Sequence, residues 1–151
     1  MTIAAEIETR IERSTEDVYA ALTAVDRFPE WLIASGITRV ERLDDGPLAV
    51  GSQVRIAQSV SGRSTVLEGT ITQAEPGRAF GLEARDRDGV SVEIDAAVVP
   101  DGSGTRLRWG LRIGLPLRFR MFESMVAPQA RRAATLDLEA FKRRLESVAK
   151  D

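Results

Sequence analysis

The side chains in this sequence that could carry chemistry are few and scattered. General acid–base catalysis needs a polar group inside a cavity, and a buried carboxylate with a raised pKa could act as a general base. The spacing shows no serine–base pair and no pair of carboxylates, so no catalytic residue can be assigned. For Arg55, Glu68 and Asp137 the favoured interpretation is that they lie in water as solvated charges. The candidates for polar groups inside the fold are Tyr19, Gln53, Arg55, Glu68, Gln129 and Asp137.

The chain contains no cysteine and no histidine. Histidine is the side chain that most often transfers protons near neutral pH. Cysteine and histidine are also the ligands that zinc and most transition metals prefer. We therefore expect no disulfide, no tightly bound transition metal and no cofactor.

The composition is that of an ordinary globular protein, with 43% hydrophobic and 29% charged residues among 151. A net charge of −2 gives no general attraction to nucleic acid. The first residues lack the basic and apolar regions of a signal peptide, and no apolar run is long enough to span a bilayer. We expect a cytoplasmic location.

An apolar stripe at helical spacing predicts a long helix from Pro128 to Lys150. Its C-terminal half is bulky and fills the space against a sheet, whereas its alanine-rich N-terminal half leaves room. We infer an open pocket over the alanines. The alternative is that bulky side chains of the sheet fill the gap. The stripe consists of Ala130, Ala134, Leu138, Phe141, Leu145 and Val148.

The N-terminal part predicts one strand and two short helices. Residues 2–12 alternate between apolar and polar, which is typical of a strand with one wet face. Ser14 can cap a helix that ends near Thr23. Asp26 is expected to cap a second short helix, and Gly36 to end it.

Regularly spaced turn signals between Ile37 and Ile113 predict an antiparallel meander of six strands. On the last two strands, acidic residues of one can face arginines of the other across the solvent side. The linker 114–127 then leads to the long helix, and Pro128 predicts a kink. The order is β-α-α-β6-α, an α+β fold in one domain, 1–151.

Five short motifs match one known family in order and spacing: IERSTEDVYAAL (Ile11–Leu22), DRFPEW (Asp26–Trp31), VGS (Val50–Ser52), EPGR (Glu75–Arg78) and GTRLRW (Gly104–Trp109). With them the chain resembles the START-like superfamily, also called Bet v 1-like or SRPBCC, and within it the polyketide cyclase/dehydrase-like branch. The resemblance implies a helix-grip fold, in which a seven-stranded curved antiparallel sheet surrounds a long C-terminal helix and leaves a ligand cavity between them. Members bind lipids, sterols, polyketides or plant hormones, and some are cyclases.

The expected function is therefore binding of a hydrophobic small molecule, such as a lipid or polyketide, in that cavity. A polyketide cyclase or aromatase acting in the same cavity is the alternative. A membrane-contacting lipid carrier is a second alternative, because Arg118 and Arg120 flank apolar residues that could weakly touch an anionic membrane surface. The residues expected to line the cavity, or else to pack as plain core, are Trp31, Phe80, Leu82, Val92, Ile94, Trp109, Leu111, Met121, Met125, Ala130, Ala133 and Ala134.

Overall fold

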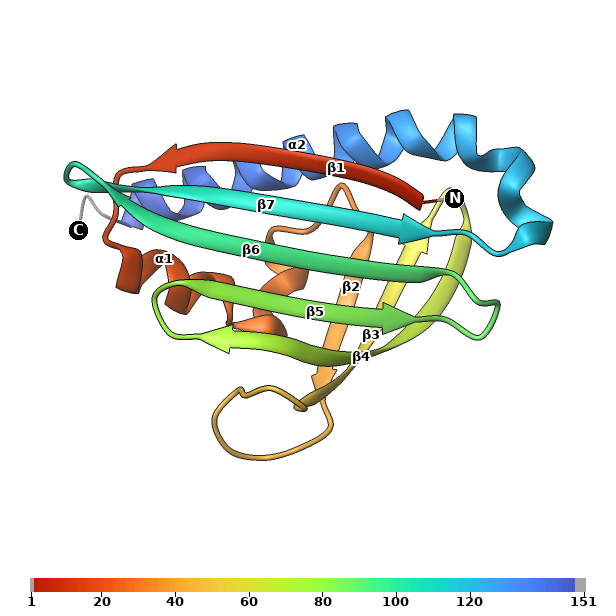
Figure 1. Cartoon of the computed structure of the whole chain (residues 1–151), viewed down its shortest axis with the longest axis horizontal. Coiled ribbons are helices and arrows are strands. Elements are labelled where there is room, and N and C mark those ends of the chain that lie inside the picture. The colour runs from red at the N-terminus through yellow and green to blue at the C-terminus, as the bar shows by residue number, and fades with distance from the viewer. Residues whose placement is uncertain (1, 149–151) are drawn as a thin grey trace.

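A computed structural model describes residues 2–148, and its centre is a seven-stranded antiparallel sheet (Figure 1). The strands are β1 (Thr2–Ile11), β2 (Ile37–Arg42), β3 (Gln53–Val60), β4 (Arg63–Glu75), β5 (Ala79–Arg85), β6 (Ser91–Asp101) and β7 (Gly104–Gly114). Their order in the sheet is β1-β7-β6-β5-β4-β3-β2. The predicted six-stranded meander is confirmed, and β1 extends it by pairing with β7 from Thr2↔Gly114 to Ile11↔Thr105.

Within the described residues, four helical segments accompany the sheet: α1 (Thr15–Leu22), the 3₁₀ helices η1 (Val25–Glu30) and η2 (Leu117–Phe122), and α2 (Glu123–Val148). Figure 1 shows α2 running lengthwise along the curved sheet, with α1 near one end. A long C-terminal helix gripped by a curved antiparallel sheet is the helix-grip fold, as predicted.

Alternation along β6 and β7 separates the two faces of the sheet. Val98 and Trp109 are buried on the inner face. On the outer face, the predicted cross-strand ion pairs are present: Arg106–Asp101 at 3.1 Å, Arg108–Asp95 at 3.4 Å and Arg112–Glu93 at 3.7 Å. Exposed pairs of this kind stabilise a sheet only slightly. For the site, the ion pairs matter because they show that the three arginines lie on the outer face and do not point into the fold.

The two predicted helix caps have different outcomes. Ser14 caps α1 as expected, because its hydroxyl oxygen accepts a hydrogen bond from the Asp17 N–H at 3.1 Å. Asp26 does not cap η1, because the segment begins at Val25 and Asp26 lies inside its first turn. A capping residue must precede the helix and keep an extended backbone. Ala24 occupies that position and has no side-chain oxygen.

The predicted start of the long helix at Pro128 is wrong. Helix α2 begins at Glu123, directly after η2, and Pro128 lies in its second turn. Only one backbone hydrogen bond is lost there, since the proline has no N–H to offer the carbonyl of Ser124. Residues 117–127 of the predicted linker therefore already belong to helical structure. Val148 is the last described residue of α2, and residues 149 and 150 of the predicted helix lie outside the described residues.

Aromatic packing clamps the C-terminal half of α2 to the sheet. Phe141 is 2% exposed, as the stripe predicts, and its ring centroid lies 4.6 Å from that of Trp31. Trp31 in turn packs edge-on against Trp109 of β7, at 5.5 Å between centroids. Leu138, one turn before Phe141, is also buried. This cluster fixes the C-terminal half of α2 against the sheet. It thereby also sets how far the N-terminal half of α2 lies from the sheet.

Candidate functional site

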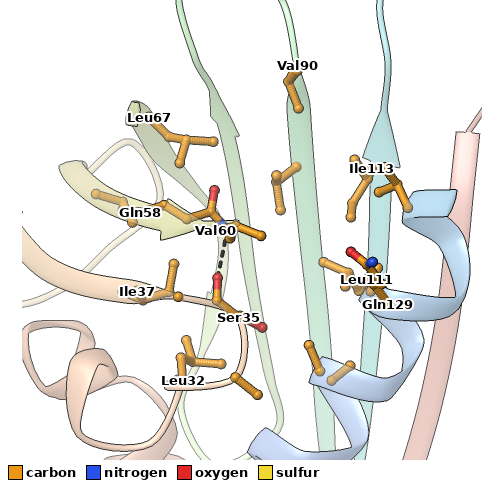
Figure 2. Close-up of a pocket in the computed structure, with 18 of the residues that line it drawn as sticks. Leu32, Ser35, Ile37, Gln58, Val60, Leu67, Val90, Leu111, Ile113 and Gln129 are labelled. Atoms are coloured by element: carbon orange, nitrogen blue, oxygen red, sulfur yellow. Dashed lines mark hydrogen bonds between the residues drawn. The ribbon is translucent and has the colours of Figure 1, made fainter. Parts of the chain in front are cut away.

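A cavity of about 780 Å³ lies between the inner face of the sheet and the N-terminal half of α2. Figure 2 shows its walls, with α2 on one side and the strands and the Leu32–Ile37 loop facing it. Cavities that hold small organic molecules commonly have volumes of about 300–1,000 Å³. This cavity is therefore large enough for a drug-sized molecule.

The alanines of α2 border this space, together with inward residues of strands β2 to β7. Small side chains on the helix stop short of the sheet, while strand alternation directs alternate residues into the gap. Gln129 joins them from α2 (Figure 2). The structure places these sequence-predicted residues around the cavity: Leu82, Val92, Ile94, Trp109, Leu111, Gln129, Ala130, Ala133 and Ala134.

Trp31 and Phe80 lie behind the cavity wall, in the core. Phe28 of η1 lines the cavity and covers both rings. Its ring packs edge-on against Trp31 at 5.7 Å and against Phe80 at 6.4 Å. The expectation that Trp31 and Phe80 line the cavity is therefore corrected, and the alternative that they pack as plain core applies to both.

Met121 and Met125 point away from the cavity and are 77% and 63% exposed. In η2, residues three apart share a face, so Phe119 and Phe122 line the cavity while Met121 does not. On α2, the helical period places Val126, rather than Met125, on the face of Ala130 and Ala133. Neither predicted methionine is part of the lining.

Three predicted polar candidates lie on the outer face of the sheet. Gln53, Arg55 and Glu68 are exposed, and Arg55 pairs with Glu68 at 3.7 Å. Tyr19 is half-buried away from the cavity, and burial raises the pKa of its hydroxyl, with a further increase from the charge of Glu75. None of these four can contact a ligand in the cavity.

Asp137 is buried, so the alternative that it is a solvated charge is wrong for this residue. Its two carboxylate oxygens accept hydrogen bonds from the backbone N–H groups of Ala34 (2.8 Å) and Ser35 (3.0 Å). Burial raises the pKa of Asp137, and these hydrogen bonds partly oppose the rise. The carboxylate thus fastens α2 to the loop after η1, which borders the cavity. Asp137 itself does not line the cavity.

Sequence reasoning missed Gln58 as a lining residue. Its amide nitrogen donates a hydrogen bond to the carbonyl oxygen of Ser35 at 2.9 Å (Figure 2). A weak signal was present in the sequence, because Val54 and Ile56 are apolar and period-two alternation puts Gln58 on their face. Two apolar residues were too short a pattern to assign the faces of this strand, and the structure shows that both are buried.

Arg63 was also missed, and it anchors a charged cluster at one end of the cavity. It forms ion pairs with Asp88 and with Asp86, the latter at 3.7 Å. Arg118 lies 4.0 Å from Asp88, and the Arg118 guanidinium lies 4.9 Å from the centre of the Phe119 ring. These contacts join the β3–β4 turn, the β5–β6 turn and η2. We call these five residues the mouth cluster.

The sequence model of the family described as "Polyketide cyclase / dehydrase and lipid transport" matches residues 2–146. The chain belongs to this family. Family and fold together fit the binding of a hydrophobic ligand or polyketide cyclisation. No curated protein matches the chain significantly.

Solved structures share the fold at low sequence identity. A START superfamily protein from Mycobacterium smegmatis is 18% identical with a TM-score of 0.80, and the match covers 96% of this chain and 98% of that one. The Zhui aromatase/cyclase from Streptomyces sp. R1128 is 15% identical with a TM-score of 0.77, covering 97% and 94%. A protein from Thermus thermophilus is 14% identical with a TM-score of 0.76, covering 96% and 98%. At identities this low, the similarity to these structures establishes only the fold of the chain.

Within residues 2–148, no helix is both long and apolar enough to cross a membrane.

Proposed function

We propose that this protein binds an apolar small molecule in the cavity between the sheet and α2. The observation that carries the proposal is the cavity itself, about 780 Å³ of space walled mainly by aliphatic and aromatic side chains. Covering apolar surface on both ligand and wall releases water and stabilises the complex by roughly 25 cal/mol per Å². The fixed end of α2 preserves this space, because the clamp at Phe141 holds the helix at its distance from the sheet.

The lining favours binding over cyclisation. Catalysis of cyclisation needs a group that can take or give a proton beside the ligand. Among the described lining residues there is no carboxylate, lysine or tyrosine. Asp137 is a buried acid on the same helix, but both its oxygens already accept hydrogen bonds from the loop. A carboxylate held in this way acts as a structural anchor.

The direct test places a larger side chain in the cavity. Ala130→Leu should reduce binding of the apolar fluorophore N-phenylnaphthylamine at least about tenfold, since the leucine occupies ligand space; a tenfold change corresponds to about 1.4 kcal/mol. Ala20→Leu is the matched control, because Ala20 lies exposed on α1 and should leave binding unchanged. Absence of binding by the unmodified protein would refute the proposal, as would undiminished binding by Ala130→Leu.

Native mass spectrometry of the purified protein is an independent test. A co-purified apolar molecule, displaced when N-phenylnaphthylamine is added, would give the mass of the natural ligand. The same molecule should be missing from the Ala130→Leu variant and present in Ala20→Leu. Its retention by Ala130→Leu would place it outside the cavity.

A second candidate, transient contact with a membrane surface, is favoured by the exposed apolar side chains beside the mouth cluster. Leu117, Met121 and Met125 are exposed there, and Arg120 lies among them in η2. Apolar and basic side chains together suit an anionic bilayer surface. Met121→Ser should reduce sedimentation with anionic vesicles, whereas Val99→Ser, on the exposed side of β6, should not. Equal sedimentation of both variants with the unmodified protein would refute this candidate.

A further inference from the structure

The charge of Arg63 is already balanced at the cavity. Arg63 is the single charged side chain among the described lining residues. It faces Asp86 and Asp88, and Arg118 faces Asp88 as well. Two guanidinium groups thus face two carboxylates, and the mouth cluster carries no net charge. An anion at Arg63 would have to compete with carboxylates that are already in place.

Asp86 cannot easily move aside. Asp86 is buried, and one of its oxygens accepts hydrogen bonds from the backbone N–H groups of Asp88 (2.9 Å) and Val90 (3.0 Å). The Asp86 N–H donates to the Val90 carbonyl at 3.0 Å. Asp86 therefore builds the β5–β6 turn. Displacing Asp86 to expose Arg63 would break these hydrogen bonds and leave the N–H groups of the turn without their partners, which is unfavourable.

The remaining polar groups of the lining are neutral. Because a carbonyl oxygen can only accept, the hydrogen bond to Ser35 requires the amide nitrogen of Gln58 to face the loop. The amide oxygen of Gln58 then faces away from Ser35, as Figure 2 shows. Gln129 brings a second amide from α2. Amides form good hydrogen bonds with hydroxyl and carbonyl groups but do not neutralise a charge.

From these contacts we infer that the cavity selects an uncharged ligand, an apolar molecule whose polar groups are hydroxyls or carbonyls. It rejects an anion of the same skeleton, because the charge of Arg63 is already neutralised by Asp86 and Asp88. Moving an ionised group out of water without a free counter-charge is far more costly than moving a hydroxyl. This inference rests on the proposed function and names the class of ligand for that same site.

Two fluorophores with one skeleton test the selectivity. N-Phenylnaphthylamine is neutral, and anilinonaphthalenesulfonate adds a sulfonate to the same rings. Only the part of each signal that Ala130→Leu removes is counted, because the sulfonate probe also adheres to exposed apolar surface. The neutral probe should bind at least about tenfold more tightly, a difference of about 1.4 kcal/mol. Binding of neither probe would refute the proposed function. Equal binding, or tighter binding of the sulfonate, would overturn this inference and leave the proposed function standing.

A charge variant tests the cause. Asp88→Asn keeps the shape of the side chain but leaves the mouth cluster with an unbalanced guanidinium. The affinity for the sulfonate probe, divided by the affinity for the neutral probe, should rise about two- to fivefold. This is the size expected for one partly exposed charge. Glu68→Gln is the matched control, since it removes a carboxylate paired with Arg55 on the outer face and should leave the ratio unchanged. A ratio that stays the same in Asp88→Asn, or that rises equally in Glu68→Gln, would overturn the inference.

Discussion

The two halves of α2 contact the sheet through different side chains and with different results. In the C-terminal half, Leu138 and Phe141 are buried, and Phe141 packs on Trp31. In the N-terminal half, Ala130 and Ala133 border a cavity of about 780 Å³. One amphipathic stripe therefore serves two purposes, since its bulky part fills space and its small part leaves space open.

Asp137 stands at the boundary between these halves. Its carboxylate holds the backbone of Ala34 and Ser35, so the loop that borders the cavity is fastened where the packed half of the helix begins. The comparison shows that an open cavity depends on tight packing next to it. Side chains that fill one half of the helix set the separation that the alanines of the other half cannot set themselves.

The largest expected effect concerns the packed half. Phe141→Ala should lower the free energy of unfolding by about 3–5 kcal/mol, because it removes a fully buried ring and leaves a void. Urea denaturation measures this change. Phe122→Ala is the control beside the open half of α2. Phe122 is the last residue of η2 and is 45% exposed, so its loss should lower the free energy of unfolding by much less than Phe141→Ala does. Equal losses for the two variants would contradict the contrast between a packed end and an open end.

The next effect concerns the boundary. Asp137→Asn should lower the free energy of unfolding by about 1–3 kcal/mol in mild acid, because an amide offers one acceptor oxygen to two backbone N–H groups. Glu139→Gln, an exposed carboxylate-to-amide change on the same helix, should have little effect. Urea denaturation of both variants and the unmodified protein measures the difference.

The pH dependence of that difference has a definite sign. Burial raises the pKa of Asp137 in the folded protein. The contribution of this residue to stability is then fully present below the ordinary aspartate pKa of about 4, and it is lost as the pH rises through the raised pKa. The difference in free energy of unfolding between the unmodified protein and Asp137→Asn should decrease as the pH increases. A gap that widens would mean that the two hydrogen bonds outweigh burial.

The smallest expected effect on stability concerns the open half. Ala130→Leu should change the free energy of unfolding by less than about 1 kcal/mol, because the new side chain enters empty space, whereas overpacking a filled core costs about 1–3 kcal/mol. Ala134→Leu sharpens the comparison, since Ala134 borders the cavity but is only 2% exposed and lies next to the packed half. We expect Ala134→Leu to cost more than Ala130→Leu. The reverse order would contradict the assignment of the open half to the N-terminal part of α2.

The sequence predicted the fold well because the patterns that encode it are local. Period-two alternation located β1, β6 and β7, and glycine-containing turns separated the strands of the meander. The cap at Ser14 and the burial of Phe141 follow from residue types and helical spacing. The start of α2 was missed because Pro128 is tolerated in a second turn at the cost of one hydrogen bond.

The candidate site could be predicted only in part. The alanines and the inward residues of β5–β7 follow from periodicity, and the structure places them around the cavity. Trp31 and Met121 were misplaced, since periodicity gives a face but does not say which other side chain covers it. Phe28 covers Trp31, and the 3₁₀ geometry of η2 turns Met121 outward.

By itself, the sequence determined the order of elements, the two faces of each well-patterned strand and the contrast between the bulky and the small part of one helix. Only the tertiary structure decided which polar groups meet the cavity. Arg63 and Asp86 are distant in sequence but adjacent in space, and so are Asp137 and the Ala34 backbone. Charge balance and burial depend on such long-range neighbours, whereas periodicity depends only on the chain on either side of a residue.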